Sequence, residues 1–600
     1  MTHLPPPPAP APAPAPRSLA PPTGIAGLGS VGESLLHLLL TAGHRVVAVD
    51  TDPDALARAA RRVKAVHGDG PGPGAVTFTA DHALLRGASV VVEAVPDTPD
   101  AKAGVLRQVT AVCPPGTTLV TTTAALPVTR LALSAGRPAD LVGLRLFTPP
   151  CAGGPVEPVA TPLASRQATA ALDALVAAAG LAPVEVGAGP AGDATALVLG
   201  LLNRSVHLLE EGYAGHHDID TALRLGCGLP AGPLEMLDRI GLDTAHSALT
   251  DLWRRTGESS FQPAPLLGRM VEAQQLGRKS GHGFYTYDER GAPLPGDGPA
   301  PDTDAAGVGR VGVLGSGAMA RGIAEVTATA GHPTVLVARS TAKADSAVHA
   351  VEASLTRAVR RGRITPDTKS AALGRLTGAD DTAALADCDL VIEAAAEELT
   401  VKRALFAALG RTCAPGTVLA TTTSSLSVTA CAEACGRPAD VVGLHFFNPA
   451  PVMRLVELVR TDTAAPRTLA VARAFCRGLG KSVVECGDRT GFIVNRLLFP
   501  YLGAALALLD RPGAEDTLIE RTDAAVQHGY GYPMGPFALL DTIGLDVALA
   551  IQQRLHAHFT TPAYAPSPAL ADLVGAGCLG RKNGHGLKGP TGPQTATRSR

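Results

Sequence analysis

The chain has 600 residues, a net charge of −2 and only 3% aromatic residues. One hydrophobic core does not serve so long a chain, so several domains are expected. Basic residues are scattered without aromatic neighbours, which argues against nucleic-acid binding. The ten cysteines have no metal-ligand spacing, so we predict no metal site and a reduced, cytoplasmic protein. No run of 18 or more apolar residues occurs, so no membrane span is expected.

The start of the chain carries a glycine-rich turn. Residues 1–22 are mostly proline and alanine and are expected to form a disordered tail. Residues 23–50 follow the order strand, G-x-G-x-x-G turn, helix, strand, acid, which in this context predicts dinucleotide binding. The turn residues are Gly27, Gly29 and Gly32, and the acid is Asp50.

The same order of elements returns in the second half of the chain. There the turn is formed by Gly315 and Gly317, with Ala320 in place of the third glycine. Further stretches match at a near-constant interval: 89–94 with 389–394, 116–123 with 416–423, 136–140 with 436–440, and 277–283 with 580–586. The chain is therefore predicted to be a tandem duplication of one unit.

Each copy begins with alternating strands and helices and ends with helical patterns alone. This order predicts an α/β fold, in which a Rossmann-type doubly wound domain precedes an all-helical domain. The predicted boundaries are 23–187 and 188–287 for the first copy, a Pro/Gly/Asp-rich linker at 288–307, 308–486 and 487–590 for the second copy, and a disordered tail at 591–600.

The strand ends of the second copy carry chemically useful side chains. Ligands bind outside the carboxyl ends of parallel strands, and here those ends carry Glu393, Glu397, Ser424, His445 and Glu457. A lone histidine in a strand is more often structural. With a carboxylate to fix its tautomer and a hydroxyl to hold a substrate oxygen, it becomes a general base. The set predicts the interconversion of an alcohol and a ketone by a nicotinamide cofactor.

Several stretches of the second copy closely resemble the L-3-hydroxyacyl-CoA dehydrogenases, particularly the 3-hydroxybutyryl-CoA dehydrogenases. They are residues 423–426 (Thr-Ser-Ser-Leu), 443–451 (Gly-Leu-His-Phe-Phe-Asn-Pro-Ala-Pro), 456–457 (Val-Glu), 491–496 (Gly-Phe-Ile-Val-Asn-Arg) and 580–582 (Gly-Arg-Lys). The resemblance covers essentially the whole second copy. It implies reversible hydride transfer between a nicotinamide cofactor and (S)-3-hydroxyacyl-CoA or 3-oxoacyl-CoA, in fatty-acid or short-chain acyl-CoA metabolism.

The resemblance also implies roles for individual residues. His445 is the general base paired with Glu457, while Ser424 and Asn495 surround the substrate hydroxyl and thioester. Glu397 corresponds to a glutamate that contacts the cofactor. Further candidates are Ser354, Arg361 and Lys402, at or near positions that contact coenzyme A, and Asn448 for substrate binding; Lys402 is also counted as cofactor-binding. Arg and Lys suit the phosphates of coenzyme A, although both are also common on solvated helix faces.

The cofactor preference departs from the family pattern. The family ends its second strand in Asp, which binds the ribose of NAD, whereas the second copy has Arg339 and Ser340 at this place. An acid repels a 2′-phosphate, and Arg next to Ser can accept one. We therefore expect the second copy to prefer NADP(H) or to accept both cofactors.

The first copy has lost the catalytic set. Ala124, Arg145, Thr148 and Gly200 stand for Ser424, His445, Asn448 and Asn495, and only Glu157 keeps its place. Arginine does not act as a base near neutral pH, so we predict no catalysis there. This copy could still bind a dinucleotide or serve as a scaffold.

The helical domains are expected to form an internal pseudo-dimer or a homodimer. Another 3-hydroxy substrate, such as a carrier-bound acyl group or a sugar acid, stays open.

Overall fold

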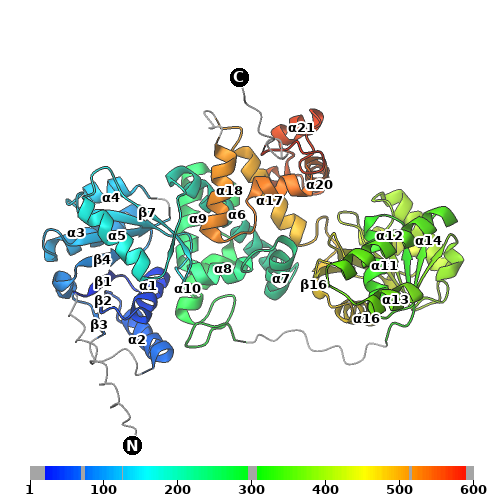
Figure 1. Cartoon of the computed structure of the whole chain (residues 1–600), viewed down its shortest axis with the longest axis horizontal. Helices are drawn as coiled ribbons and strands as arrows, with labels where there is room; N and C mark the ends of the chain where they lie inside the picture. The colour runs from blue at the N-terminus through cyan, green and yellow to red at the C-terminus, as the bar shows by residue number, and fades with distance from the viewer. Residues whose placement is uncertain (1–20, 69–74, 125, 295–306, 512–516, 589–600) are drawn as a thin grey trace, which may run out of the picture. The chain divides into compact units, whose positions relative to one another are not determined.

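A computed structural model describes residues 21–68, 75–124, 126–294, 307–511 and 517–588. The chain divides into two compact units, residues 1–188 and 189–600. The first unit holds the sheet domain of the first copy. The second unit holds the helical domain of the first copy and both domains of the second (Figure 1). The predicted tails fall almost wholly outside the described residues, as does most of the predicted linker.

An eight-stranded sheet of order β3-β2-β1-β4-β5-β6-β7-β8 forms the centre of the first unit. β1 to β6 run parallel, β7 is antiparallel to β6, and β8 is parallel to β7. The strands are β1 (Thr23–Ala26), β2 (Val46–Val49), β3 (Val76–Thr79), β4 (Val90–Glu93), β5 (Thr118–Thr123), β6 (Leu141–Arg145), β7 (Pro155–Val159) and β8 (Ala182–Pro183). The helices are α1 (Ser30–Thr41), α2 (Pro53–His67), α3 (Pro99–Val112), α4 (Val128–Ser134) and α5 (Arg166–Ala178), with a 3-10 turn η1 (His82–Gly87).

Alternate residues of the strands belong to two separate cores, one on each face of this sheet. Helices α1, α2 and α5 cover one face, where Ile25 and Val92 pack against Leu36. Helices α3 and α4 cover the other, where Val91 packs with Leu106. Because both faces are buried, the strands are nearly continuous apolar runs. The strand order reverses between β1 and β4, which opens a crevice at their carboxyl ends.

The second copy repeats this sheet with the order β11-β10-β9-β12-β13-β14-β15-β16. The strands are β9 (Val311–Leu314), β10 (Thr334–Val337), β11 (Leu376–Ala379), β12 (Leu390–Glu393), β13 (Val418–Thr421), β14 (Val441–Phe446), β15 (Leu455–Arg460) and β16 (Ser482–Gly487). The helices are α11 (Ala318–Thr329), α12 (Thr341–Arg360), α13 (Pro366–Arg375), α14 (Leu399–Thr412), α15 (Val428–Cys435) and α16 (Pro466–Gly478), with 3-10 turns η4 (Thr382–Leu385) and η5 (Pro438–Asp440). The predicted α/β class with doubly wound sheets is confirmed in both copies.

The two sheets differ in one connection. Residues 50–75 join β2 to β3 in the first copy, whereas residues 338–375 join β10 to β11 in the second. The longer connection accommodates a long helix, α12, and a second helix, α13, which packs against α12 and α11. The coenzyme A candidate Ser354 lies on α12 and the candidate Arg361 directly follows it, within this longer connection.

The remaining parts of both copies are helical, as predicted. In the first copy they are α6 (Ala188–Glu210), α7 (His216–Cys227), α8 (Pro233–Ile240), α9 (Leu242–Thr256), α10 (Pro265–Glu272), η2 (Ser259–Phe261) and η3 (Arg278–Ser280). In the second they are α17 (Val494–Ala507), α18 (Leu518–Tyr530), α19 (Pro536–Ile543), α20 (Leu545–Phe559), α21 (Pro568–Gly575) and η6 (Pro562–Tyr564). Among the described residues, no helix combines the length and apolar character that crossing a membrane requires.

A short hydrogen-bonded segment follows the first helical domain. Residues 288–294, assigned to the linker by composition, continue the fold: Pro293 forms a β-bridge with Tyr287, and the Leu294 N–H donates to the carbonyl of Thr286. The shared Gly-Arg-Lys motif lies just before this segment. Its lysine pairs with an aspartate at the start of α9 or α20, since Lys279 Nζ lies 2.6 Å from Asp243. The motif is therefore explained by the fold of the helical domains.

Candidate active site

His445 and Glu457 lie directly opposite each other on the antiparallel strands β14 and β15. Directly opposed residues point to the same face of a sheet, and His445 Nδ1 lies 2.6 Å from Glu457 Oε2. The carboxylate is fully buried and the imidazole is nearly so. A carboxylate only accepts hydrogen bonds, so Nδ1 carries the proton and Nε2 is left as the basic nitrogen. The register of two strands therefore produces an oriented base.

The second oxygen of Glu457 is held by the helical domain of the same copy. Oε1 accepts hydrogen bonds from the backbone N–H groups of Ile493, at 3.0 Å, and Val494, at 2.9 Å. Phe492, just before them, has φ +47 and its ring lies 5.5 Å from the His445 ring. With both oxygens occupied, Glu457 cannot turn away from His445. The base is thus fixed by groups from two domains.

Ser424 completes the set that the sequence predicts. Its hydroxyl lies 3.2 Å from Nε2 of His445. Because Nε2 carries no proton, the serine hydroxyl can donate a hydrogen bond to it. Another hydroxyl can take the place of the serine hydroxyl at Nε2. Asn495 is the second residue of α17 and follows the Glu457-binding amides directly. Its side chain is partly exposed. The structure thus brings Ser424, His445 and Glu457 together and places Asn495 at the domain boundary beside them.

Three titratable side chains that are influenced by the charge of Glu457 have raised pKa values. Burial and, to a smaller extent, the charge of Glu457 raise the pKa of the Cys227 thiol to about 12. The same two causes raise the pKa of Cys486. Burial also raises the pKa of Tyr213. These groups stay protonated at neutral pH, so none of them adds a second negative charge that competes for the His445 proton.

Glu397 organises the loop that carries Ser424. Its Oε1 accepts from the Thr423 hydroxyl at 2.7 Å, from the Ser424 N–H at 2.9 Å and from the Ser425 N–H at 3.2 Å. Arg554 of α20 reaches the same loop, with Nη1 3.0 Å from the Ser425 hydroxyl. Glu397 is predicted from the sequence as a cofactor contact, and its positioning role is evident only from the fold. Glu397 and Ser424 lie far apart in the sequence, so no local sequence pattern indicates that they are in contact.

Lys402 does not lie where the phosphate prediction needs it. The side chain is 1% exposed. Its Nζ lies 2.8 Å from Glu393 Oε2 and 2.9 Å from Oε1, beneath the strand end. Thr421 donates to the same carboxylate. A buried lysine with this partner holds β12, β13 and α14 together and does not reach a coenzyme A phosphate in solvent. The first copy repeats the pair with Lys102 and Glu93.

The glycine turns fit a dinucleotide. Gly315 has φ +139, and a Cβ there would lie 2.4 Å from the carbonyl oxygen of Ala394, so only glycine fits. Gly317 is the N-cap of α11, and a Cβ on it would meet nothing within 4 Å. Open space before a helix N-terminus suits a pyrophosphate. Ala320 is buried behind the turn. Gly27 and Gly29 form the same arrangement in the first copy.

The structure corrects the position of the missing acid. Asp50 directly follows β2, and its Oδ2 accepts from the Leu28 N–H at 2.7 Å. The residue directly after β10 is Ala338, which is buried. Ser340 matches Asp52, since both are helix N-caps. The acid is therefore replaced by Ala338, and Arg339 and Ser340 lie one and two positions further on.

The first copy keeps the carboxylate and replaces the base. Arg145 Nε lies 2.7 Å from Glu157 Oε2, and Arg145 Nη1 lies 3.1 Å from the carbonyl of Ala124. Oε1 of Glu157 again accepts from two backbone N–H groups, those of Val186 and Gly187. An ion pair thus fills the place of the His–Glu pair. Arginine has no basic nitrogen to offer, and Ala124 has no hydroxyl.

The alignment of Asn495 with Gly200 is wrong. Gly200 lies within α6 beside Phe261, whereas Asn495 lies at the start of α17.

Three further candidates do not join the catalytic group through any bond among the described residues. The Ser354 hydroxyl bonds to the buried Glu325, Arg361 is exposed at the end of α12, and Asn448 is exposed after β14.

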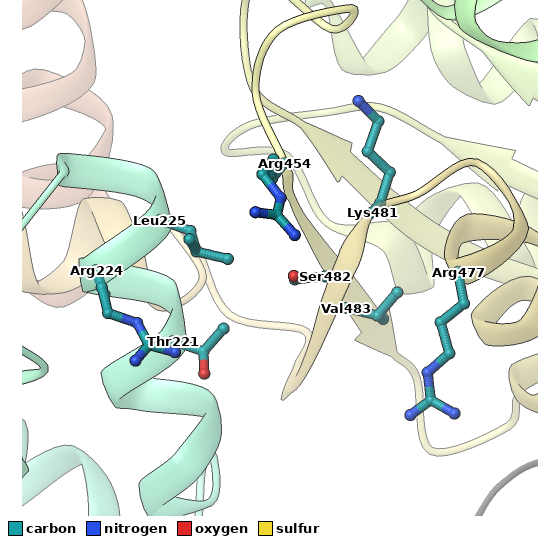
Figure 2. Close-up of a pocket in the computed structure, with 8 residues that line it drawn as sticks. All are labelled: Thr221, Arg224, Leu225, Arg454, Arg477, Lys481, Ser482 and Val483. Atoms are coloured by element: carbon teal, nitrogen blue, oxygen red, sulfur yellow. The ribbon is translucent and has the colours of Figure 1, made fainter.

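A cavity of about 600 Å³ lies outside this catalytic group, between α7 and the start of β15 and β16 (Figure 2). Arg224 faces it from α7, and Arg454 and Ser482 face it from the second sheet. Figure 2 shows Lys481 directed away from the others; its Nζ donates to the carbonyls of Ala450 and Met453. The cavity is cationic and contains none of the predicted catalytic residues.

The domain and sequence comparisons agree with this geometry. The family model of the 3-hydroxyacyl-CoA dehydrogenase NAD-binding domain matches residues 23–189 and 310–489, and that of the C-terminal domain matches 194–287 and 491–588. A 3-hydroxybutyryl-CoA dehydrogenase of Mycobacterium tuberculosis is 44% identical over 283 residues, which cover 46% of this chain and 97% of the relative. The mitochondrial hydroxyacyl-coenzyme A dehydrogenase of Rattus norvegicus is 40% identical over 285 residues, covering 46% and 90%.

One solved structure is also similar to this chain in sequence. The crystal structure of an (S)-3-hydroxybutyryl-CoA dehydrogenase from Ralstonia eutropha is 35% identical and covers 47% of this chain and 98% of its own, with a TM-score of 0.44. Each of these relatives spans about one copy. The two domain models, by contrast, match both copies and more than half of the chain. The chain therefore belongs to the 3-hydroxyacyl-CoA dehydrogenase family, as an oxidoreductase that carries its NAD-binding and C-terminal domains twice.

Proposed function

We propose that the second copy interconverts (S)-3-hydroxyacyl-CoA and 3-oxoacyl-CoA, with His445 as the acid and base. The observation that carries this proposal is the fixed pair of His445 and Glu457 with its free Nε2 beside Ser424. A nicotinamide dinucleotide in the crevice beside the glycine turn supplies the hydride acceptor or donor. Nε2 of His445 takes the hydroxyl proton during oxidation and returns it during reduction. Glu457 stabilises the imidazolium that forms, and Ser424 and Asn495 hold the substrate oxygens.

The proposed cofactor of the second copy is NADP(H), with NAD(H) accepted more weakly. Arg339 is exposed directly after the buried Ala338, so the acid that would repel a 2′-phosphate is missing from the end of this strand. Within the described part of the chain, the Arg339 guanidinium makes no hydrogen bond or ion pair. Lys343, exposed in the first turn of α12, adds a second cation nearby. A free guanidinium binds a phosphate well.

The first copy is proposed to bind a dinucleotide without catalysis. It keeps Gly27, Gly29 and Gly32, together with Asp50, which suits the ribose hydroxyls of NAD. Titration of the chain with NADH in the presence of saturating NADPH tests this. Binding of about one further equivalent supports two sites of opposite preference. If NADH binds only in competition with NADPH, the first copy is a scaffold without a cofactor.

Two further proposals concern assembly and location. The helical domains of the two copies touch within the second unit, where the Tyr530 hydroxyl lies 3.1 Å from Thr195 and Arg511 lies 2.6 Å from Asp193. These contacts support an internal pseudo-dimer. All ten cysteines are free, most of them buried, which supports a reducing, cytoplasmic environment.

The reduction of acetoacetyl-CoA tests the catalytic proposal directly. Initial rates are followed at the nicotinamide absorbance with NADH and with NADPH, for the wild type, His445→Ala and the matched first-copy variant Arg145→Gln. We expect His445→Ala to lose about 10²- to 10⁴-fold in kcat and Arg145→Gln to keep the wild-type rate. Substantial activity of His445→Ala would mean that another base acts. A wild type inactive on acetoacetyl-CoA but active on a carrier-bound 3-oxoacyl group would redirect the substrate assignment.

A further inference from the structure

The catalytic geometry depends on the conformation of the segment from Gly487 to Arg496. It links the second sheet to α17 and carries the two N–H groups that hold Glu457. Its backbone is irregular, since Gly491 has φ +84 and Phe492 has φ +47. A side chain as large as phenylalanine rarely adopts a positive φ, so this turn persists only if its surroundings fix it. The catalytic base therefore depends on what packs around the segment.

Side chains of the first copy fix this segment from outside. Glu211, directly after α6, accepts on Oε2 from Arg489 at 2.9 Å and from Arg496 at 3.1 Å. The two arginines flank the irregular turn, so one carboxylate ties its two ends together. Tyr213 donates its hydroxyl to the carbonyl of Gly487 at 2.7 Å. Both anchoring residues belong to the copy that has lost its own base.

The arginine that Glu211 binds is itself enclosed. Arg496 is 6% exposed. Its guanidinium lies 4.6 Å from the Tyr213 ring and 5.0 Å from the Phe559 ring, so it is stacked between one aromatic side chain from each copy. Glu211 Oε2 is the carboxylate oxygen that neutralises this enclosed charge. The Glu211 side chain itself is 42% exposed, and removing its carboxylate leaves the Arg496 guanidinium without the anion that pairs with it.

Helix α7 of the first copy packs closely against two side chains next to these amides. A Cβ on Gly226 would lie 3.0 Å from Val494 and 3.1 Å from Leu455. Val494 donates one of the two N–H groups to Glu457, and Leu455 begins the strand that carries Glu457. The first copy thus contacts the Glu457-binding turn through both a charge and a close packing site.

We propose that Glu211 of the first copy is a positioning residue for the catalytic base of the second copy. Through Arg489 and Arg496 it holds the turn whose N–H groups orient Glu457, and Glu457 in turn orients His445. The proposal rests on the assignment of His445 and Glu457 made above. It gives the degenerate copy a defined task, which is to complete the active site of its neighbour in the same chain.

The variant Glu211→Gln tests this proposal in the full-length protein. It keeps the shape of the side chain and removes the charge, and we expect kcat to fall about 10- to 100-fold, as for a small misplacement of a catalytic group. KM for acetoacetyl-CoA and the cofactor should change by less than about twofold, since neither site is touched. Tyr213→Phe, which removes the bond to Gly487, should lower kcat in the same direction. Glu210→Gln is the matched control, because Glu210 binds Arg269 within its own copy, and it should match the wild type.

A double-mutant cycle separates positioning from general stability. In a Glu457→Gln background, Glu211→Gln should cause no further loss of kcat, because both changes act on the orientation of His445. An equal further loss in that background would overturn the proposal, as would a wild-type kcat for Glu211→Gln. Full activity of His445→Ala and Glu457→Gln would instead overturn the catalytic assignment itself, so the two failures are distinguishable.

Discussion

Arg145 Nε lies 2.7 Å from Glu157 Oε2, and both side chains are buried. Removing one partner of a buried pair leaves an uncompensated charge, at a cost of about 3–5 kcal/mol. We expect Arg145→Ala to lower the unfolding temperature of the first unit and to leave kcat of the folded protein unchanged. Thermal unfolding and initial rates measure both quantities. Arg166→Ala, an exposed change in the same unit, is the control. Loss of kcat without unfolding would show that the first copy takes part in catalysis.

The cofactor preference depends on Arg339. Replacing it with alanine removes the charge-assisted contact to a 2′-phosphate, which is worth about 1.5–3 kcal/mol. KM for NADPH should therefore rise about 10- to 100-fold, while KM for NADH stays the same because NADH has no such phosphate. Steady-state kinetics with both cofactors measure this difference. Arg411→Ala, an exposed change at the end of α14, should alter neither value. An unchanged KM for NADPH in Arg339→Ala would contradict the NADP assignment.

Lys402 is expected to support the fold and not to bind phosphate. Lys402→Met keeps much of the volume but leaves Glu393 without its cation, so stability should fall by about 3–5 kcal/mol. KM for the acyl-CoA substrate should stay within about twofold of the wild type in the folded protein. Denaturant unfolding and kinetics at low temperature test both points. Lys102→Met should destabilise the first copy to a similar degree. A large rise in KM with intact stability would restore the phosphate role.

We expect Asp218 to make the stability of the second unit depend on pH. Burial, with a smaller contribution from the charge of Glu485, raises the pKa of Asp218 from 3.8 to about 6. The folded state then holds a proton that the unfolded state releases between about pH 4 and pH 6, so stability falls as pH rises through this window. Asp218→Asn removes the titration. The difference in unfolding temperature between variant and wild type should therefore grow in favour of the variant from pH 4 to pH 7. The exposed change Asp251→Asn should show no such trend, and a flat difference for Asp218→Asn would contradict the shift.

Local sequence patterns predicted those site residues whose positions follow directly from a turn or from the register of adjacent strands. Glycines fix the turn before α11, and His445 and Glu457 face each other because a short loop joins two adjacent strands. The burial of Lys402 was missed because a charged residue in the first turn of a helix looks the same in sequence whether it faces solvent or a strand end. The Ala338 position was missed by one residue because a strand end has no sharp sequence mark.

The long-range contacts were beyond the reach of sequence patterns. Glu457 takes its two N–H groups from Ile493 and Val494, in another domain, and backbone groups leave no trace in side-chain patterns. The Glu211 contact with Arg496 joins residues separated by 285 positions. Nothing local distinguishes Glu211 from its neighbour Glu210, which makes an ordinary surface pair. Only the packing of the two copies separates the roles of these adjacent glutamates.

The tandem arrangement has a genetic consequence. In a symmetric homodimer, one codon change appears in both subunits, so a base lost from one active site is lost from both. Here the two halves are encoded separately and always occur together in a one-to-one ratio. Ala124 and Arg145 could therefore arise in one half while His445 was retained in the other. Covalent fusion thereby allows one half to lose its own catalytic base and to support the active-site geometry of the other half.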